Sequence, residues 1–153
     1  MSHNNTFIVK TLCTGATAGI ATTLAVAASG ERDQGEAIAP INAISHIVWG
    51  DEAATHDEIS FKYTATGLAL NAAAVMSWAA MHEFFFGKVS RESLACAFAG
   101  GAVISSVAYV TDYHVVPPRL MPGFEKRVAP RSMLPIYASL AIGLGLGSWL
   151  QRR

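Results

Sequence analysis

Charged residues are scarce in this sequence. Only 14% of its 153 residues are charged, whereas ordinary soluble domains have about 25%. Charge is wholly absent from two stretches, Leu94 to Ala108 and Met133 to Leu150. A soluble protein of this size needs more polar surface to cover its core. The composition, with 52% hydrophobic residues, therefore places the chain among membrane proteins.

Several chemical signatures are also missing. The 11 basic and 11 acidic residues balance, and without a basic stripe no nucleic-acid partner is expected. The sequence has no CxxC or HExxH motif, no Ser-His-Asp spacing and no phosphate-binding glycine loop. Bis-histidine haem and di-iron sites lack the necessary histidines. We therefore expect no cofactor, and enzyme activity is not favoured.

Four apolar stretches are each long enough to cross a hydrocarbon core of about 30 Å, which takes roughly 20 helical residues. They are continuous and lack the alternation of a membrane barrel, so they predict helices. The expected fold is all-α, a single domain over 1–153 that forms a four-helix transmembrane bundle. The predicted spans are 7–29, 61–87, 93–113 and 132–150.

The first of these stretches has an alternative interpretation. Lys10, the following apolar run and Ala25-Val26-Ala27 resemble a signal peptide with its cleavage site. The run is long, rich in Thr and Gly and without a distinct basic segment in front. These features favour a membrane span.

A shorter apolar segment, 37–49, lies between the first two spans. Ile38, Ile41, Ile44 and Val48 share one helical face, and 13 residues are too few to span. Trp49 favours the headgroup level. The pattern predicts an interfacial helix, preceded by a solvated turn over 31–36.

The remaining connections are polar or rich in proline. Gly87 is expected to end the second span before a tight turn over 88–92. The loop 114–131 contains four prolines and should track the surface without a regular helix. With four spans both termini lie on one face, and five basic residues against six on the other leave the orientation open.

Small residues predict close helix packing. Gly15 and Gly19 in the first span, and Gly143 and Gly147 in the fourth, are GxxxG pairs. They indicate packing within the bundle or, as the alternative, a homo-oligomer. Small and polar residues also share one face in each of the two middle spans, and we expect these two faces to meet. The face of span 61–87 carries Thr64, Gly67, Asn71, Trp78 and His82, and that of span 93–113 carries Gly101, Ser105, Ala108 and Asp112.

One candidate cluster lies near the membrane face that carries the termini. Helical rise places His82, Glu83, Cys13 and Cys96 at a similar depth. Thiol and imidazole groups can bind a transition metal, so Cys13, His82 and Cys96 are candidate metal ligands. Without ligand spacing to support it, no metal site is predicted. The alternative is two buried thiols with Glu83 paired to Lys88 or Arg91.

The second candidate cluster lies at the opposite face. Asp112 ends the third span, and Arg119 follows across a proline-stiffened turn as its possible ion-pair partner. His46 and Trp49 could join from the interfacial helix. Either the cluster is a structural clamp on the loop, or it is a small binding or proton-handling site, because ionisable groups at membrane depth are often functional.

Two segments carry a resemblance to other proteins. Residues 41–50, Ile-Asn-Ala-Ile-Ser-His-Ile-Val-Trp-Gly, and 111–125, from Thr111 to Glu125, resemble an uncharacterised group of small bacterial inner-membrane proteins. The resemblance would run over most of the chain from Ile41 onward. It implies a four-helix architecture and a multi-pass location in the bacterial inner membrane, and it brings no activity.

The favoured interpretation is a non-catalytic accessory or assembly component in contact with the bilayer, as a homo-oligomer or within a larger membrane complex. The alternative is a small-solute or proton-coupled transporter that uses Asn71, His82 and Glu83 inside the bundle and Asp112 with Arg119 at the far mouth. A metal- or thiol-dependent redox enzyme is the third possibility.

Overall fold

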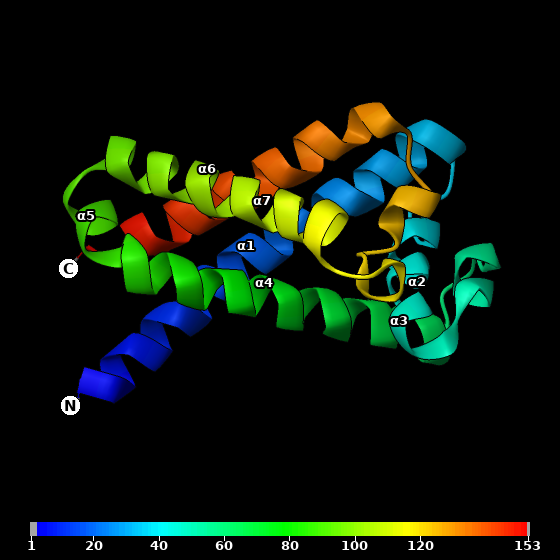
Figure 1. Cartoon of the computed structure of the whole chain (residues 1–153), viewed down its shortest axis with the longest axis horizontal. Helices are drawn as coiled ribbons and strands as arrows, with labels where there is room; N and C mark the ends of the chain where they lie inside the picture. The colour runs from blue at the N-terminus through cyan, green and yellow to red at the C-terminus, as the bar shows by residue number, and fades with distance from the viewer. Residues whose placement is uncertain (1–2, 153) are drawn as a thin grey trace. The chain divides into compact units, whose positions relative to one another are not determined.

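The computed structural model describes residues 3–152, and within them every regular element is helical, with no strand. The long helices are α1 (His3–Gln34), α4 (Thr66–Phe85), α6 (Leu94–Val110) and α7 (Met133–Trp149) (Figure 1). They correspond to the four predicted spans. The all-helical prediction is confirmed.

Shorter elements fill the connections. Two helices, α2 (Ala39–Ile44) and α3 (His46–Trp49), and the 3-10 segment η1 (Asp51–Thr55) follow α1. The π-helical η2 (Phe61–Ala65) leads into α4, and α5 (Gly87–Glu92) joins α4 to α6. A π-helical segment, η3 (Thr111–Val115), extends α6; the 3-10 turns η4 (Pro118–Leu120), η5 (Phe124–Lys126) and η6 (Pro130–Ser132) precede α7.

Three helical segments are long and apolar enough to cross a membrane. They are Thr6–Gln34, Leu94–Val115 and Pro130–Trp149. The predicted span 61–87 is not among them, although α4 has 20 residues. Asn71, His82 and Glu83 lower its hydropathy. The chain is thus a helical membrane protein with three candidate spans.

The chain forms two compact units. Unit 1 comprises α1 up to Thr22, the segment Ala72–Ala108 and the chain from Tyr137 onward. Unit 2 comprises Thr23–Asn71 and Tyr109–Ile136. The long helices contribute to both.

The core of unit 1 is built from small and branched side chains of four helices. It contains Ala18 of α1, Val75 and Ala79 of α4, Ile104 and Ala108 of α6, and Leu140 and Leu144 of α7. In Figure 1 the short α5 lies where α4 turns back into α6.

Glycines let the helices of unit 1 approach closely. A Cβ built on Gly143 would lie 2.5 Å from the Cα of Ala18, and one on Gly147 would lie 2.8 Å from the Cα of Thr14. The GxxxG pair of α7 therefore packs against α1 within the same chain. The pair in α1 differs, because Gly15 lies against Met76 whereas Gly19 has open space.

Two residues of the predicted α6 stripe contact α7, while a third, Ala108, packs in the core that α4 shares. A Cβ on Gly101 would lie 2.1 Å from the carbonyl oxygen of Ala141, and the Ser105 hydroxyl donates to the carbonyl of Tyr137 at 2.6 Å. Both partners belong to α7. The missing side chain at Gly101 admits the α7 backbone, and the hydroxyl then finds its acceptor there.

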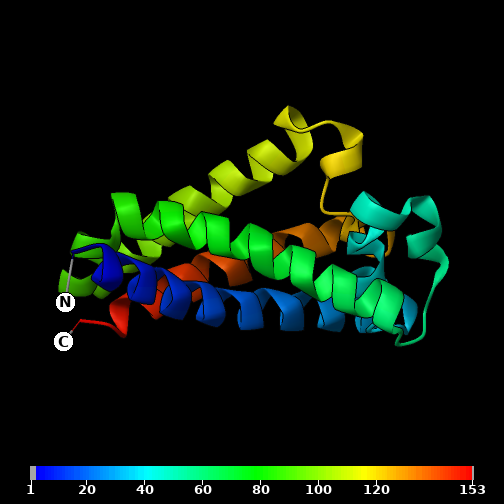
Figure 2. The same ribbon diagram turned by 90° about the horizontal axis from the view of Figure 1, so that it is seen from below.

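Unit 2 gathers short elements around α2. All six residues of α2 are buried, and this helix packs against η1, η2 and η5. Figure 2 shows the proline-rich loop lying beside α2 and α3. As predicted, that loop has no regular α-helix. Its prolines, with fixed φ and no N–H, begin the 3-10 turns η4 and η6.

Three local predictions need correction. The segment 37–49 is two short helices broken at Ser45, and its first helix is buried on all sides. The predicted solvated turn 31–36 is the last turn of α1, which ends where Gly35 adopts a φ of 74° and donates to Glu31 at 2.9 Å. The turn over 88–92 is helical and begins at Gly87.

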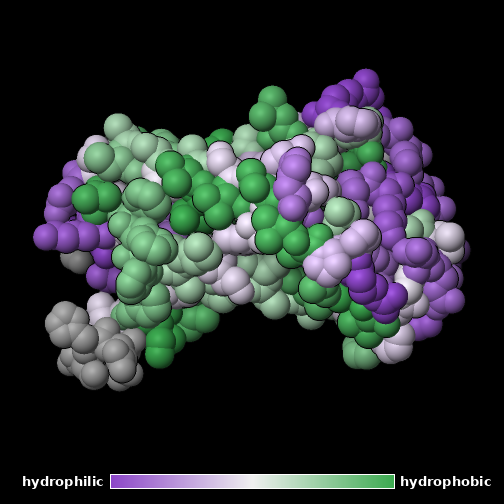
Figure 3. Space-filling view, viewed as in Figure 1, coloured by the Kyte–Doolittle hydropathy of each residue, from purple (hydrophilic) through white to green (hydrophobic). Residues whose placement is uncertain are grey.

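Hydrophilic and hydrophobic residues are segregated on the surface. In Figure 3 hydrophilic residues gather over α2, α3 and the segments next to them, while α4 and α6 show mostly hydrophobic residues. Large side chains on these helices are exposed, among them Phe84 at 73% and Val103 at 49%. Such surfaces suit contact with lipid.

Candidate functional site

The most buried charge in unit 1 belongs to Glu83 near the end of α4. Its side chain is 1% exposed, and Arg91 of α5 donates from Nη1 to Oε2 at 2.7 Å. The Thr14 hydroxyl of α1 donates to Oε1, also at 2.7 Å. Both carboxylate oxygens thus have partners, as a buried charge requires.

A side-chain amide extends this network to α7 and the chain's end. Gln151 donates from Nε2 to Thr14 Oγ1 at 2.9 Å, to the Gly147 carbonyl at 2.8 Å and to the Lys10 carbonyl at 3.2 Å. The network therefore ties α1, α4, α5 and α7 together. Sequence reasoning proposed Arg91 as one partner of Glu83, but Thr14 and Gln151 gave no signal because their contacts span long distances in sequence.

Gly87 makes room for the ion pair. A Cβ at this position would lie 2.4 Å from Glu83 Oε2 and 3.2 Å from Arg91 Nη1. Any other residue would push into the two charged groups. Gly87 is thus required for close approach rather than for stopping α4.

His82, beside Glu83 in sequence, is fully buried. Its ring lies against α6: a Cβ on Gly100 would be 3.2 Å from Nε2, and the Phe86 ring centroid is 6.0 Å away. The ring faces the Ala97 carbonyl, but neither nitrogen makes a hydrogen bond of normal geometry. An imidazole without partners is costly to bury.

The three candidate metal ligands are not brought together. Cys13 and Cys96 are free and exposed, whereas His82 is buried. Among the described residues no group of three or more His, Cys, Asp or Glu side chains is placed to hold a metal ion. The prediction of two buried thiols is also wrong, because these positions face outward.

In unit 2 His46 links α3 to the proline-rich loop. It is 1% exposed, and Nε2 lies 2.9 Å from the Met121 carbonyl oxygen. A carbonyl only accepts, so Nε2 carries the hydrogen in this contact. Nδ1 then faces Lys126 Nζ at 3.4 Å and Asp51 Oδ1 at 3.8 Å.

Gly123 allows the loop to reach this histidine. Its φ is 93°, and a Cβ would lie 2.5 Å from both His46 Cδ2 and the Ala43 carbonyl oxygen. Both conformation and space therefore demand glycine here.

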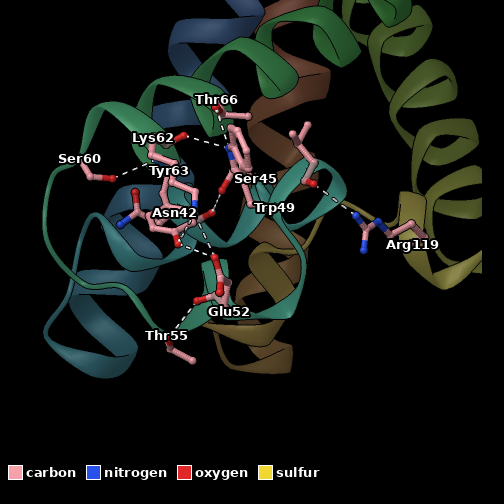
Figure 4. Close-up of polar contacts among 11 residues, drawn as sticks. Asn42, Ser45, Trp49, Glu52, Thr55, Ser60, Lys62, Tyr63, Thr66 and Arg119 are labelled. Carbon is pink, nitrogen blue, oxygen red and sulfur yellow. Dashed lines mark hydrogen bonds and ion pairs between the residues drawn. The ribbon is translucent and has the colours of Figure 1, made fainter.

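Hydrogen bonds of Trp49, the last residue of α3, and of Arg119 connect this helix to neighbouring segments (Figure 4). The Trp49 indole donates to the Lys62 carbonyl and to Thr66 Oγ1, both at 3.1 Å. Arg119 donates from Nε to the Ile47 carbonyl at 3.0 Å. These contacts join α3 to η2, to α4 and to η4.

The other two candidates also lie in unit 2. Asn71 of α4 donates to Thr23 Oγ1 of α1 at 3.1 Å. Asp112 lies in η3, and its predicted pairing with Arg119 stays a prediction.

Asn42 is a central residue of unit 2 that sequence reasoning did not select. It is fully buried and donates to the carbonyls of His56 and Glu58, at 2.8 and 3.0 Å. Its Oδ1 accepts from Thr64 at 2.6 Å. In the sequence, Asn42 is marked only as a side-chain amide within the apolar segment 37–49.

Asp33 was also missed, because it lies in a charged stretch that looked solvated. Its side chain is 2% exposed. The carboxylate accepts from the Ala129 N–H at 2.9 Å, from Arg131 Nη2 at 3.1 Å and from the Ser132 hydroxyl. The end of α1 is thereby bound to η6, the turn directly before α7, and Arg32 Nε also donates to Asp33 at 3.2 Å.

Two exposed carboxylates have perturbed acidity. A hydrogen bond from Lys126, together with its charge, holds the pKa of the Asp51 carboxyl below its ordinary value. A hydrogen bond from Tyr63 at 2.7 Å, reinforced by Lys62, does the same for the pKa of Glu52. Both acids therefore favour the ionised form in the folded chain.

Chemically, unit 2 offers paired groups that bridge backbone segments, and unit 1 offers a buried ion pair beside an imidazole without partners. Comparisons of the chain with protein-family models, curated proteins and solved structures found no match.

Proposed function

We propose that this protein is a non-catalytic accessory or assembly component of the bacterial inner membrane, with α4 as a fourth span in a four-helix bundle. A core shared by α1, α4, α6 and α7 supports the bundle. From Phe61 to Phe85 the helical chain is about 37 Å long at 1.5 Å per residue. That length suffices for a hydrocarbon core of about 30 Å.

In this arrangement α2 and α3 lie at the membrane interface. Trp49 is 42% exposed while its indole N–H has acceptors, and amphipathic Trp side chains favour the headgroup region. The hydrophilic surface over α2 and α3 (Figure 3) would then face water.

The observation that carries the accessory role is how the polar candidates of unit 2 are used. His46, Trp49 and Arg119 each bind backbone carbonyls of a neighbouring segment. A catalytic or transport group must instead meet its substrate. These contacts favour a rigid scaffold that presents a shaped, polar surface to a partner.

Purification of the tagged protein from native membranes in mild detergent tests the role. We expect a membrane-protein partner in stoichiometric amount. The variant Ser77→Ala should retain the partner, because it removes an α4 hydroxyl that donates to the backbone of its own helix. A folded protein that elutes alone in several detergents would contradict the accessory role.

A second candidate function is small-solute or proton-coupled transport. It is favoured by α4, where Asn71, His82 and Glu83 lower the hydropathy of a core helix. Polar groups within spans often mark transport pathways. In proteoliposomes we expect flux that Glu83→Gln abolishes and Ser77→Ala preserves. Equal flux from protein-free vesicles would contradict this function.

A further inference from the structure

The ring nitrogens of His82 are buried without the hydrogen-bond partners that an imidazole normally has. A neutral imidazole has one donor and one acceptor nitrogen, and here both are buried without a hydrogen bond of normal geometry. The surroundings are Phe86, Ala97 and Gly100, which offer one backbone carbonyl and no side-chain partner. Packing alone would be served better by an apolar residue.

Two charged groups of unit 1 act on the His82 ring through their electric fields: Glu83, the next residue of α4, and Arg91 of α5. Glu83 is in turn faced by Arg91 from α5, by the Thr14 hydroxyl from α1 and by the Ser148 hydroxyl from α7. Within residues 3–152, Arg91 is the one cation paired with Glu83. Its own side chain is 19% exposed, so it connects the buried carboxylate to the surface.

We propose that His82 and Glu83 together form a binding site for one exchangeable proton, with Arg91 as the counter-charge that leaves when the proton arrives. With the imidazole neutral and the carboxyl ionised, the two side chains together carry one negative charge, which Arg91 balances. The added proton forms an N–H bond on the imidazole or an O–H bond on the carboxyl. The pair then has no net charge, and neither Glu83 nor Arg91 loses a covalent bond.

Arg91 is suited to leave because it lies at the edge of the site. Once the pair is neutral, the guanidinium gains little from the buried carboxylate and is better solvated in water. It belongs to α5, the short helix between α4 and α6. Proton binding would therefore release the contact that holds α5 to α4. This proposal goes beyond the accessory role, and it does not require transport, because a proton can bind here without crossing the membrane.

The test uses the full-length protein in lipid nanodiscs, labelled with ¹⁵N at histidine and arginine, in a nuclear magnetic resonance titration between about pH 4 and pH 9. We expect the Arg91 side-chain signals to move from paired to solvated positions, and the His82 ring signals to change at the same midpoint. In His82→Gln the midpoint of Arg91 release should move by about one pH unit or more.

The matched control is His114→Gln, since His114 is an exposed histidine in unit 2. It should leave the Arg91 midpoint unchanged. The proposal is wrong if Arg91 stays paired throughout in the wild type, or if His82→Gln leaves the midpoint in place. Should His82→Gln fail to fold, the wild-type titration decides alone: different midpoints for His82 and Arg91 would overturn the shared site.

Discussion

Arg91 and Glu83 are eight residues apart in sequence, and Nη1 of the guanidinium lies 2.7 Å from Oε2 of the carboxylate. The pair joins α4 to α5 across Gly87. Glu83 is buried while Arg91 reaches the surface. This asymmetry means that the two residues respond differently to mutation.

Removal of the arginine should be the more damaging change. Arg91→Met leaves the buried carboxylate without its counter-charge, and we expect a loss of about 3 kcal/mol in the free energy of unfolding. The double variant Glu83→Gln, Arg91→Met should recover part of this loss. Denaturant titrations in detergent would measure both. A double variant less stable than Arg91→Met would contradict a pair that acts as a unit.

Two glycines provide a steric test of the same site. In Gly87→Ala the new methyl meets the carboxylate at 2.4 Å, so we expect destabilisation of about 1–3 kcal/mol. Gly19→Ala is the control, because it adds a methyl to α1 in open space and should be neutral or stabilising by up to about 1 kcal/mol. Equal melting temperatures for the two variants would show that Gly87 does not make room for the pair.

Asp33 should stabilise unit 2 far more than its exposed neighbours do. Asp33→Asn keeps the shape of the side chain but removes the charge that accepts from Arg131, Ser132 and the Ala129 N–H. We expect a loss of about 1–3 kcal/mol. Glu36→Gln, at an exposed position, should change stability little. Hydrogen exchange at the start of α7 should rise in the first variant alone; unchanged exchange there would refute the link.

Acid should weaken unit 2 around η1. The pKa of Asp51 and that of Glu52 lie below their ordinary values of 3.8 and 4.5. A carboxyl with a lowered folded-state pKa stabilises the fold above its unfolded value, and this contribution is lost as pH falls through the folded value. Hydrogen exchange in η1 should therefore rise as pH drops below these ordinary values.

High salt should reduce that acid effect, because both carboxylates are exposed. A chain with Asp51→Asn and Glu52→Gln should lack it. The interpretation fails if this double variant shows the same rise of exchange with acid as the wild type.

Long apolar runs predicted the helices because their signal is local. Each run from Phe7 to Ser29 or from Ser132 to Leu150 carries its own length and hydropathy, and helices α1 and α7 followed. Polar residues were harder to place. Asp33 sits among charged neighbours and Asn42 in an apolar run, yet both are buried by partners far away in the sequence.

The sequence by itself determined the helical class, the membrane character and the absence of a regular α-helix from the proline-rich loop, since these depend on backbone preference and hydrophobicity within a few residues. Only the tertiary structure decided which groups meet. It paired Glu83 with Thr14, turned Ser105 toward α7 and left His82 without a hydrogen-bond partner of normal geometry. Such contacts join residues as far apart as Thr14 and Glu83, which are 69 positions apart, or Lys10 and Gln151, which are 141 positions apart. They form only when the helices pack and each buried polar group must find its partner.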